Sequence, residues 1–303
     1  MENIVIIGAG PAGLTAAIYA RRAGYEAIVL EENIYGGQVA TTSAVENYPG
    51  FREIGGTELS VNFYEQAAAL GADIRFEPLT GCALEKEVKL LTTPNRTLQT
   101  RAVIIAGGAQ RRILGCPGEE RLKGRGVSYC ATCDGAFYKD KEVAIVGGGN
   151  TALEDALFLS NSCRRVHLIH RREELRGAPI LQKAFFSREN IVFHKKRVVA
   201  EILGENAVSE LRLQSTEDKS EERLAVSGVF VAIGVQPDNA LYRGQLPLSE
   251  DGYLLAGEDC LTPLPGVFAA GDCRKKPLRQ IVTAVADGAV AATMAANYLN
   301  QLL

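Results

Sequence analysis

The residues best suited to chemistry in this sequence are two cysteines, Cys130 and Cys133, separated by Ala-Thr and followed by Asp134 and Gly135. Cysteines at this spacing can close a small disulfide ring. Such settings often lower the pKa of one thiol toward neutrality, which populates the attacking thiolate. Asp134 is a candidate acid and base for the proton that thiolate formation and quenching require, with a plain Asp-Gly turn as the structural alternative. The motif therefore indicates thiol–disulfide exchange.

The alternative for this cysteine pair is one half of a zinc site, with His167 and His170 as the other half. The two histidines are closer together than is usual in zinc fingers, and both lie beside a predicted nucleotide-binding loop. We therefore expect redox chemistry at the cysteines and no metal site.

The cysteine pair lies between two glycine-rich sequences that are typical of dinucleotide binding. The first consists of a buried apolar strand at 3–7, the loop Gly8-Ala9-Gly10-Pro11-Ala12-Gly13, and a helix to about Arg22. A second apolar strand, 27–30, ends at Glu31, which stands 18 residues after Gly13, close to where a ribose-binding carboxylate is expected. A lone glycine motif would be weak evidence, but here strand, loop, helix and acid together predict a dinucleotide site.

The second glycine-rich sequence repeats this pattern with a different ending. A strand at 142–146 precedes Gly147-Gly148-Gly149-Asn150-Thr151-Ala152 and a helix, and the next strand is 165–169. In place of an acid, that strand is followed by His170-Arg171-Arg172, with Arg176 one turn further on. Basic side chains at this place favour a nucleotide with a 2′-phosphate, and the alternative is a solvated charge cluster.

The length of 303 residues is enough for two domains with hydrophobic cores of their own. The apolar segment 102–108 and the segment 228–234 both end in glycine and resemble each other, which indicates two related nucleotide domains. A helix capped by Thr57 is expected to run through Leu70. A last strand, 266–270, precedes a helix at about 280–299 that is rich in small residues. The pattern predicts an α/β fold.

Composition excludes several other classes of protein. The net charge is −3 with mixed signs, so no basic face for nucleic acid or for an anionic membrane is indicated. The odd number of cysteines, seven, is scattered except for the one pair, which argues for a reducing compartment, so we expect a cytoplasmic protein. No basic leader precedes the first strand, and no apolar run is long enough for a membrane span.

Taken in order, the two glycine loops, the Cys130–Gly135 motif, the basic residues 170–176, Gly271-Asp272 and Arg279-Gln280 resemble the low-molecular-weight thioredoxin reductases, a branch of the pyridine nucleotide-disulfide oxidoreductases. The resemblance covers nearly the whole chain. It implies two three-layer Rossmann-like domains, an NADPH domain at 114–241 that carries the redox cysteines and is inserted into a split FAD domain at 1–113 and 242–303. It also implies a thioredoxin-like protein as partner and a homodimer.

The resemblance further implies a role for individual residues. Those expected at the flavin are Gly8, Gly10, Pro11, Ala12, Gly13, Glu31, Gly36, Gly37, Gln38, Asn47, Gly271, Asp272, Arg279, Gln280 and Ile281. Those expected at NADPH are Gly147, Gly149, Asn150, Thr151, His170, Arg171, Arg172 and Arg176, while Cys130, Cys133 and Asp134 are the expected catalytic residues. The chain departs from the family at Ala106-Gly107-Gly108, where Ala-Thr-Gly is usual, and at Cys273, which we interpret as a small buried residue.

Two alternatives stay open. One is an enzyme of the same fold with another donor or acceptor, such as ferredoxin, a peroxidase module or a small dithiol, although the basic residues after 169 argue against ferredoxin. The other is a non-catalytic redox sensor that binds flavin tightly and turns over negligibly.

Overall fold

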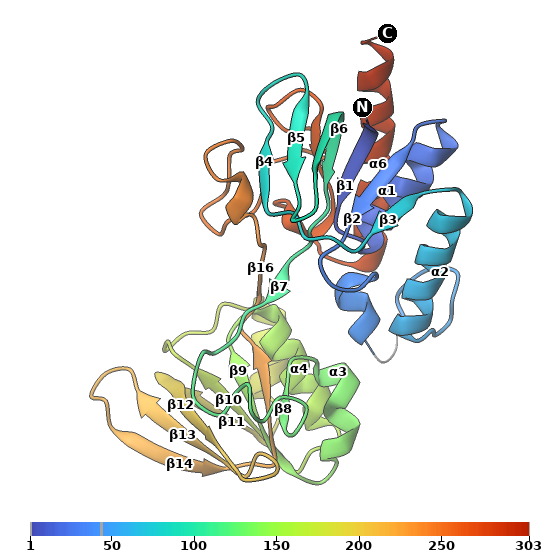
Figure 1. Ribbon diagram of the computed structural model, residues 1–303. Helices are drawn as coiled ribbons and strands as arrows, with labels where there is room; N and C mark the ends of the chain where they lie inside the picture. The colour runs from blue at the N-terminus through green and yellow to red at the C-terminus, as the bar shows by residue number, and fades with distance from the viewer. Residues whose placement is uncertain (1, 43–44, 303) are drawn as a thin grey trace. The chain divides into compact units, whose positions relative to one another are not determined.

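The computed structural model describes residues 2–42 and 45–302 and divides the chain into two compact units. The first unit comprises residues 1–110 and 236–303, and the second comprises residues 111–235. The expected boundaries, after residues 113 and 241, lie slightly beyond these division points. The chain crosses between the units at β7 (Gln110–Arg111) and β16 (Val235–Gln236), which form a two-stranded sheet (Figure 1).

A mostly parallel sheet organises the first unit, in the order β3-β2-β1-β6-β5-β4 with β17 on the other side of β6. Ile4 of β1 lies opposite Ala27 of β2 and Ala102 of β6, both in parallel register, while β4 and β5 form an antiparallel hairpin onto β6. The strands are β1 (Glu2–Ile7), β2 (Ala27–Leu30), β3 (Asp73–Arg75), β4 (Gly81–Ala83), β5 (Lys89–Thr92), β6 (Thr97–Ile105) and β17 (Val267–Ala269). The helices are α1 (Pro11–Arg22), α2 (Gly56–Ala69) and α6 (Ile281–Asn300), with short 3-10 turns η1 (Gly37–Thr41), η3 (Ala240–Tyr242) and η4 (Gly271–Cys273).

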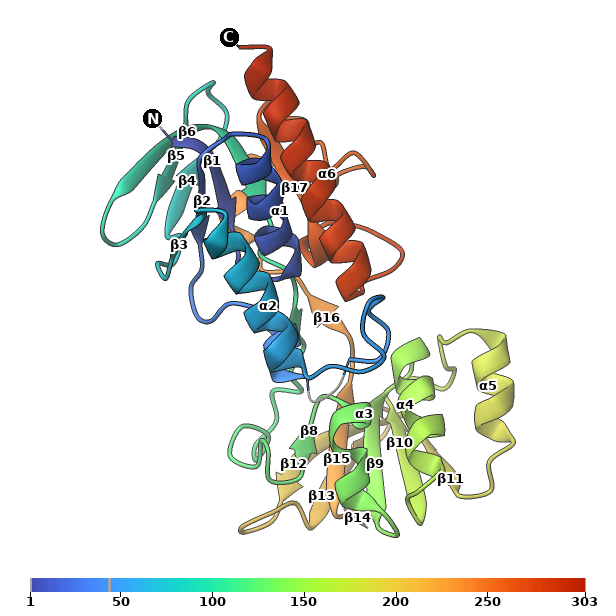
Figure 2. The ribbon, with the colours of Figure 1, turned by 90° about the vertical axis from the view of Figure 1, so that its right-hand side faces the viewer.

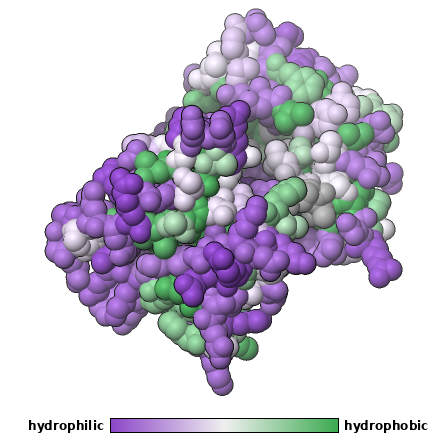
Figure 3. Space-filling model, turned by 90° about the horizontal axis from the view of Figure 1, so that it is seen from below, coloured by the Kyte–Doolittle hydropathy of each residue, from purple (hydrophilic) through white to green (hydrophobic). Residues whose placement is uncertain are grey.

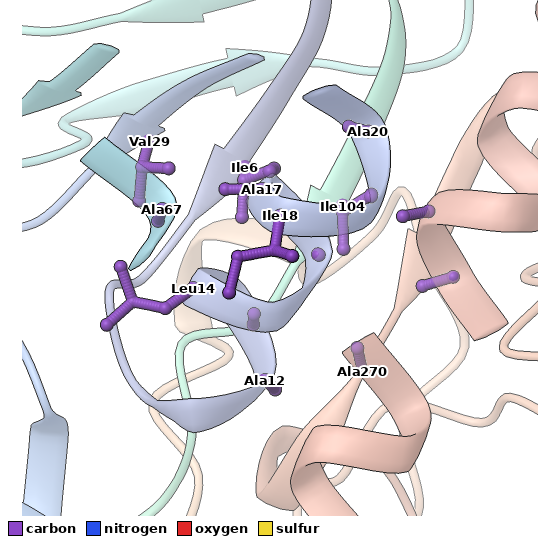
Figure 4. Close-up of a cluster of buried hydrophobic side chains, with 14 of the residues drawn as sticks. Ile6, Ala12, Leu14, Ala17, Ile18, Ala20, Val29, Ala67, Ile104 and Ala270 are labelled. Carbon is purple, nitrogen blue, oxygen red and sulfur yellow. The ribbon is translucent and has the colours of Figure 1, made fainter. Parts of the chain in front are cut away.

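Alternation along the central strands builds a separate core on each face of this sheet. Ile4 and Ile6 belong to the core under α1, α2 and α6, whereas Val5 and Ile7 belong to the core on the opposite face. Figure 4 shows part of the first core, in which Ala17 of α1 lies beside Ile6 of the sheet and Leu14 and Ile18 extend from the same helix. The helices α1 and α6 run side by side in Figure 2. The unit is therefore layered on both sides of the sheet, as expected for its class.

The second unit contains a five-stranded parallel sheet in the order β11-β10-β9-β15-β8 and a three-stranded antiparallel sheet, β12-β13-β14. The strands are β8 (Val127–Ser128), β9 (Glu142–Gly147), β10 (Arg165–His170), β11 (Ile191–Lys195), β12 (Arg197–Leu203), β13 (Glu210–Ser215), β14 (Glu221–Ala225) and β15 (Gly228–Ala232). The helices are α3 (Ala131–Asp134), η2 (Gly135–Tyr138), α4 (Asn150–Ser160) and α5 (Pro179–Phe186). The small sheet and the helices each bury a core of their own, so the expected α/β class is confirmed.

Two helix ends show how local contacts set element boundaries. Thr57 was expected to be the cap of α2, but the cap is Gly55, two residues earlier, and the helix begins at Gly56; the Thr57 hydroxyl donates instead to the carbonyl of Ala40 (3.0 Å). The cap of α6 is Gln280, whose side chain and that of Thr283 satisfy each other's backbone N–H groups.

The surface is mostly polar. Figure 3 shows a face that is largely hydrophilic with small, separate apolar patches. Within the described ranges, no helix has both the length and the apolar character that crossing a membrane requires.

Candidate functional site

The first glycine loop joins β1 to α1 and is shaped by close backbone approaches. Gly8 has a φ of +103°, and a Cβ on it would lie 2.4 Å from the carbonyl oxygen of Ala106. A Cβ on Gly13 would lie 1.8 Å from the carbonyl oxygen of Gly8, so the first turn of α1 folds directly onto the loop. Around Gly10 a Cβ would meet no atom within 4 Å. The loop therefore leaves open space for a ligand at the N-terminus of α1, where free N–H groups favour an anion.

Glu31, at the end of β2, is fixed by this loop. Its Oε2 accepts a hydrogen bond from the backbone N–H of Ala9 (2.8 Å), and its Oε1 accepts one from the N–H of Asn33 (2.9 Å). The carboxylate thus stands at the edge of the glycine loop, the position from which an acid binds a ribose hydroxyl.

Three other expected flavin residues, Gly36, Gly37 and Gly271, lie against the same loop. The N–H of Gly36 donates to the carbonyl of Ala9 (2.7 Å), a Cβ on Gly37 would lie 3.5 Å from Gly10, and a Cβ on Gly271 would lie 2.9 Å from that of Ala12. Further along, the Gln38 side chain donates to the carbonyl of Ala109, Asn47 donates to Gln280 (2.9 Å), Arg279 stacks over the Tyr253 ring (3.9 Å to its centroid), and Ile281 is the first residue of α6.

Two polar atoms in this group are buried without a partner in the described structure, Asp272 Oδ1 and Arg279 Nε. Burial raises the pKa of Asp272, and the nearby Lys276 and Arg279 only partly oppose this rise. A buried polar atom without a partner is costly unless a ligand satisfies it. The residues present therefore fit a polar ligand that spans the glycine loop and the turn at 271–272.

Sequence reasoning missed the ion network that holds this turn. Asp287 of α6 accepts hydrogen bonds from the N–H of Gly271 (2.8 Å), from Nε and Nη2 of Arg274 (2.8 Å each) and from Nζ of Lys276 (2.7 Å). Burial alone would raise the pKa of Asp287, but the bonds from Arg274 and Lys276 outweigh it and hold the pKa below its ordinary value. An acid within an apolar helix was the available signal, because a buried carboxylate requires partners.

The second glycine loop joins β9 to α4 and also depends on close approaches. A Cβ on Gly147 would lie 2.4 Å from the carbonyl oxygen of Ala232, while Gly149 faces open space. Asn150 Oδ1 accepts a hydrogen bond from the N–H of Ala178 (2.8 Å), and Thr151 is exposed at the start of α4. This loop has the same strand, turn and helix order as the first.

The basic residues after β10 divide into two environments. Arg171, Arg172 and Arg176 are exposed, and the backbone N–H of Arg176 donates to the carbonyl of Gly148 (2.7 Å), which holds it beside the loop. His170 is buried, and a Cβ on Gly148 would lie 2.3 Å from its ring. Burial lowers the pKa of His170 and keeps the ring neutral. His170 is thus buried against the loop, while the arginines that follow it in sequence are exposed.

The redox motif occupies α3 and the residue before it. Cys130 is disulfide-bonded, and the side chain of Cys133 lies outside the described part of the structure. The hydroxyl of Ser128 donates to Asp134 Oδ2 (2.6 Å) and accepts from the N–H of Cys130 (3.1 Å), and the N–H of Asp134 donates to the carbonyl of Cys130 (3.2 Å). These bonds place the Asp134 carboxylate one helical turn from Cys130.

Of the two histidines proposed for the zinc alternative, His167 has other partners. His167 Nδ1 lies 3.0 Å from His194 Nε2, and its Nε2 lies 3.2 Å from Glu142 Oε2. Among the side chains that the structure describes, no three potential metal ligands come together.

A cavity of about 420 Å³ opens beside the motif within the second unit. Asp134 and Ser128 line it, together with Arg125, Lys141 and the 73% exposed ring of Phe137. The candidate acid is therefore accessible from the surface.

Comparison with known proteins covers almost the whole chain. Residues 2–288 match the family model described as pyridine nucleotide-disulphide oxidoreductase. The chain is 46% identical to a thioredoxin reductase of Mycolicibacterium smegmatis over 99% of this chain and 97% of that protein, and 44% identical to one of Listeria innocua over 99% and 94%. Among solved structures, it resembles thioredoxin reductase of Lactococcus lactis with a TM-score of 0.81 at 37% identity, covering 99% of this chain and 100% of that one.

Proposed function

We propose that this chain, which belongs to the pyridine nucleotide-disulphide oxidoreductase family, is a thioredoxin reductase that uses FAD and NADPH. The observation that carries the proposal is a disulfide-bonded Cys130 beside a carboxylate, in a chain that also holds two glycine loops of the dinucleotide-binding type. When bound, the flavin and the nicotinamide supply the two-electron chemistry that reduces the disulfide.

The first unit holds FAD in this proposal. The N–H groups at the start of α1 bind the diphosphate, Glu31 binds the ribose, and Asp272, Arg279 and the Asn47–Gln280 pair bind toward the flavin end. The open space at Gly10 and the unpartnered atoms of Asp272 and Arg279 support this assignment. The remaining residues of the group are Gly8, Pro11, Ala12, Gly13, Gly36, Gly37, Gln38, Gly271 and Ile281.

The second unit holds NADPH. The loop of Gly147, Gly149, Asn150 and Thr151 binds its diphosphate, and the exposed guanidinium groups of Arg171, Arg172 and Arg176 bind the 2′-phosphate. His170 supports the loop from beneath as a neutral ring, which its burial favours.

The reduced cysteine pair then reduces the partner protein. A thiolate of Cys130 or Cys133 attacks one sulfur of the partner disulfide, a mixed disulfide forms, and the other partner sulfur leaves as a thiolate that takes a proton from Asp134. The second cysteine loses its proton to Asp134 and attacks the mixed disulfide, which releases the reduced partner and restores the Cys130–Cys133 disulfide. Two electrons have then passed from the cysteine pair to the partner.

The test replaces each redox cysteine separately. In Cys130→Ser and Cys133→Ser we expect flavin binding and flavin reduction by NADPH to persist, measured by visible absorbance, while reduction of thioredoxin is abolished. Full thioredoxin turnover in either variant would contradict the assignment.

One assay separates this function from its two alternatives. The purified yellow protein is mixed with NADPH, thioredoxin and a dye that reports dithiols. Turnover supports a thioredoxin reductase. Turnover only with reduced ferredoxin, or only with another acceptor, supports a related enzyme, and tight flavin without turnover supports a sensor. We also propose that the protein is cytoplasmic and that it is a homodimer. Light scattering of the purified protein tests the dimer.

A further inference from the structure

A serine that sequence reasoning did not single out connects the backbone of the redox motif to its carboxylate. Ser128 is the last residue of β8, is 5% exposed, and lies in parallel register opposite Phe230 of β15, so the sheet fixes its position. Its hydroxyl contacts three groups of the motif, Asp134 Oδ2 at 2.6 Å, the N–H of Cys130 at 3.1 Å and the carbonyl of Cys130 at 3.2 Å.

The distances determine where the single hydroxyl proton points. In a hydrogen bond from a hydroxyl to a carboxylate, the two oxygens are typically about 2.5–2.7 Å apart. The distance is longer when the acceptor is a neutral carbonyl. The 2.6 Å contact therefore takes the proton, and the oxygen of Ser128 accepts from the N–H of Cys130. The result is a chain of hydrogen bonds that runs from the N–H of Cys130 through Ser128 to the Asp134 carboxylate.

We propose that Ser128 is a positioning residue for proton transfer at the redox cysteines. Its hydroxyl holds one oxygen of Asp134 in place at the wall of the cavity. A carboxyl group held in this place can exchange a proton with the departing thiolate of the partner. This inference rests on the proposed function, because it assumes that Asp134 exchanges protons with the cysteine chemistry.

The experiment follows the oxidation of the reduced holoenzyme by thioredoxin disulfide in a stopped-flow instrument across a range of pH. Ser128→Ala removes one hydrogen bond to a charged group, so we expect a loss of up to about tenfold in rate, reduced by the partial exposure of Asp134. The pH profile of the rate should also change in this variant, because the hydroxyl contacts the group that exchanges the proton.

Two variants control for unrelated damage. Ser128→Thr keeps a hydroxyl at the same place and should retain most of the rate and the original pH profile. Ser160→Ala removes a buried hydroxyl in the same unit, one that donates to the carbonyl of Leu157 at 2.7 Å, and should leave both unchanged. Flavin content and melting temperature of each variant report its folding.

A second substrate tests the chemistry directly. An aromatic disulfide releases a thiolate of low pKa that needs no proton, so its reduction by Ser128→Ala should keep the wild-type rate while thioredoxin reduction falls. Equal losses with both substrates, or an unmoved pH profile, would overturn the inference and leave thioredoxin turnover as evidence for the proposed function.

A double substitution completes the test. If Ser128 acts through Asp134, adding Ser128→Ala to Asp134→Asn should cost no further rate. A full additional loss in the double variant would overturn the inference. If Asp134→Asn alone reacts at the wild-type rate, the inference falls together with the acid–base role of Asp134, while the assignment of the two cysteines stands on its own test.

Discussion

The two glycine loops share the order of strand, loop and helix, and they differ in the residues that lie beside the loop. In both, a Cβ on the glycine at the end of the strand would lie 2.4 Å from a backbone carbonyl oxygen, that of Ala106 for Gly8 in the first unit and that of Ala232 for Gly147 in the second. Beside the first loop, Glu31 accepts a hydrogen bond from the N–H of Ala9. Beside the second, the buried ring of His170 lies against Gly148.

This difference separates the shape of a nucleotide site from its selectivity. The glycines determine how closely strand, loop and helix approach, and both loops leave one glycine facing open space. The residues after the second strand then set the charge, an acid in the first unit and exposed arginines in the second. The same local fold can therefore accept ribose hydroxyls in one place and a phosphate in another.

The largest expected effect comes from a change at the third glycine position of the motif. This position is Gly13 in the first loop and Ala152 in the second, so the loops differ there by one methyl group. Gly13→Ala would place a Cβ 1.8 Å from the carbonyl oxygen of Gly8, a backbone atom that cannot move aside cheaply. We expect a destabilisation of about 3 kcal/mol or more and loss of flavin, measured by thermal unfolding and by visible absorbance. The reciprocal change, Ala152→Gly, should cost only about 1 kcal/mol and keep the flavin. Equal effects of the two changes would show that the loops are not as different as their packing indicates.

The next effect tests the charge beside the second loop. Arg171→Ala and Arg172→Ala should each reduce kcat/KM for NADPH by roughly ten- to a hundredfold, less where solvent screens the guanidinium, because one charged hydrogen bond to the 2′-phosphate is lost. NADH lacks that phosphate, so its kcat/KM should stay nearly constant. Glu31→Gln, in the first unit, serves as the control and should not change the ratio of the two efficiencies. Equal losses for NADH and NADPH would mean that the arginines are structural.

The smallest expected effect is a difference between the units in how their stability depends on pH. All three histidines belong to the second unit. Burial is the largest cause that lowers the pKa of His167, His170 and His194. The unfolded chain therefore binds more protons than the folded one, and stability falls as the pH drops below about 6.5. Asp155, whose pKa burial raises to about 6, acts in the opposite direction, but it is one group against three.

Hydrogen exchange resolved by segment measures this effect. Between about pH 7 and pH 5, after correction for intrinsic exchange, protection of β9, β10 and β11 should fall more than protection of β1, β2 and β6. His194→Gln should reduce the difference, because it removes one half-buried ring whose pKa is lowered by burial. A larger loss of protection in the first unit would contradict the expected direction.

The order of strand, glycine loop and acid was predictable from sequence because these features are close together in the chain. The β2 strand has the expected bounds, and Glu31 lies at the loop as its spacing predicted. His170 was grouped with Arg171 because the two are neighbours, yet His170 ends a buried strand and Arg171 begins the exposed turn after it. Adjacent residues at a strand end can thus have opposite environments.

The contacts that sequence could not supply are those made across turns and between distant segments. Nothing in the spacing of Ser128 and Asp134 indicates that the serine hydroxyl bonds to the carboxylate, since this depends on how α3 returns to the end of β8. Arg274 and Asp287 likewise come together only because α6 lies beside the turn at η4. Cys273, expected to be a small buried residue, is fully buried, and its Sγ lies 3.3 Å from the carbonyl oxygen of Ile105.

The pairing of β7 with β16 has a consequence for how such a chain can be rearranged. Because these two strands are hydrogen-bonded neighbours, the second unit starts and finishes at adjacent points. A segment whose ends lie side by side can be inserted into another protein without stretching the backbone. It can also be circularly permuted, with its original ends joined and new ends made elsewhere. If residues 111–235 are removed, a short linker is enough to reconnect the two parts of the first unit. Residues 111–235 therefore form a segment whose two ends leave the first unit at one place.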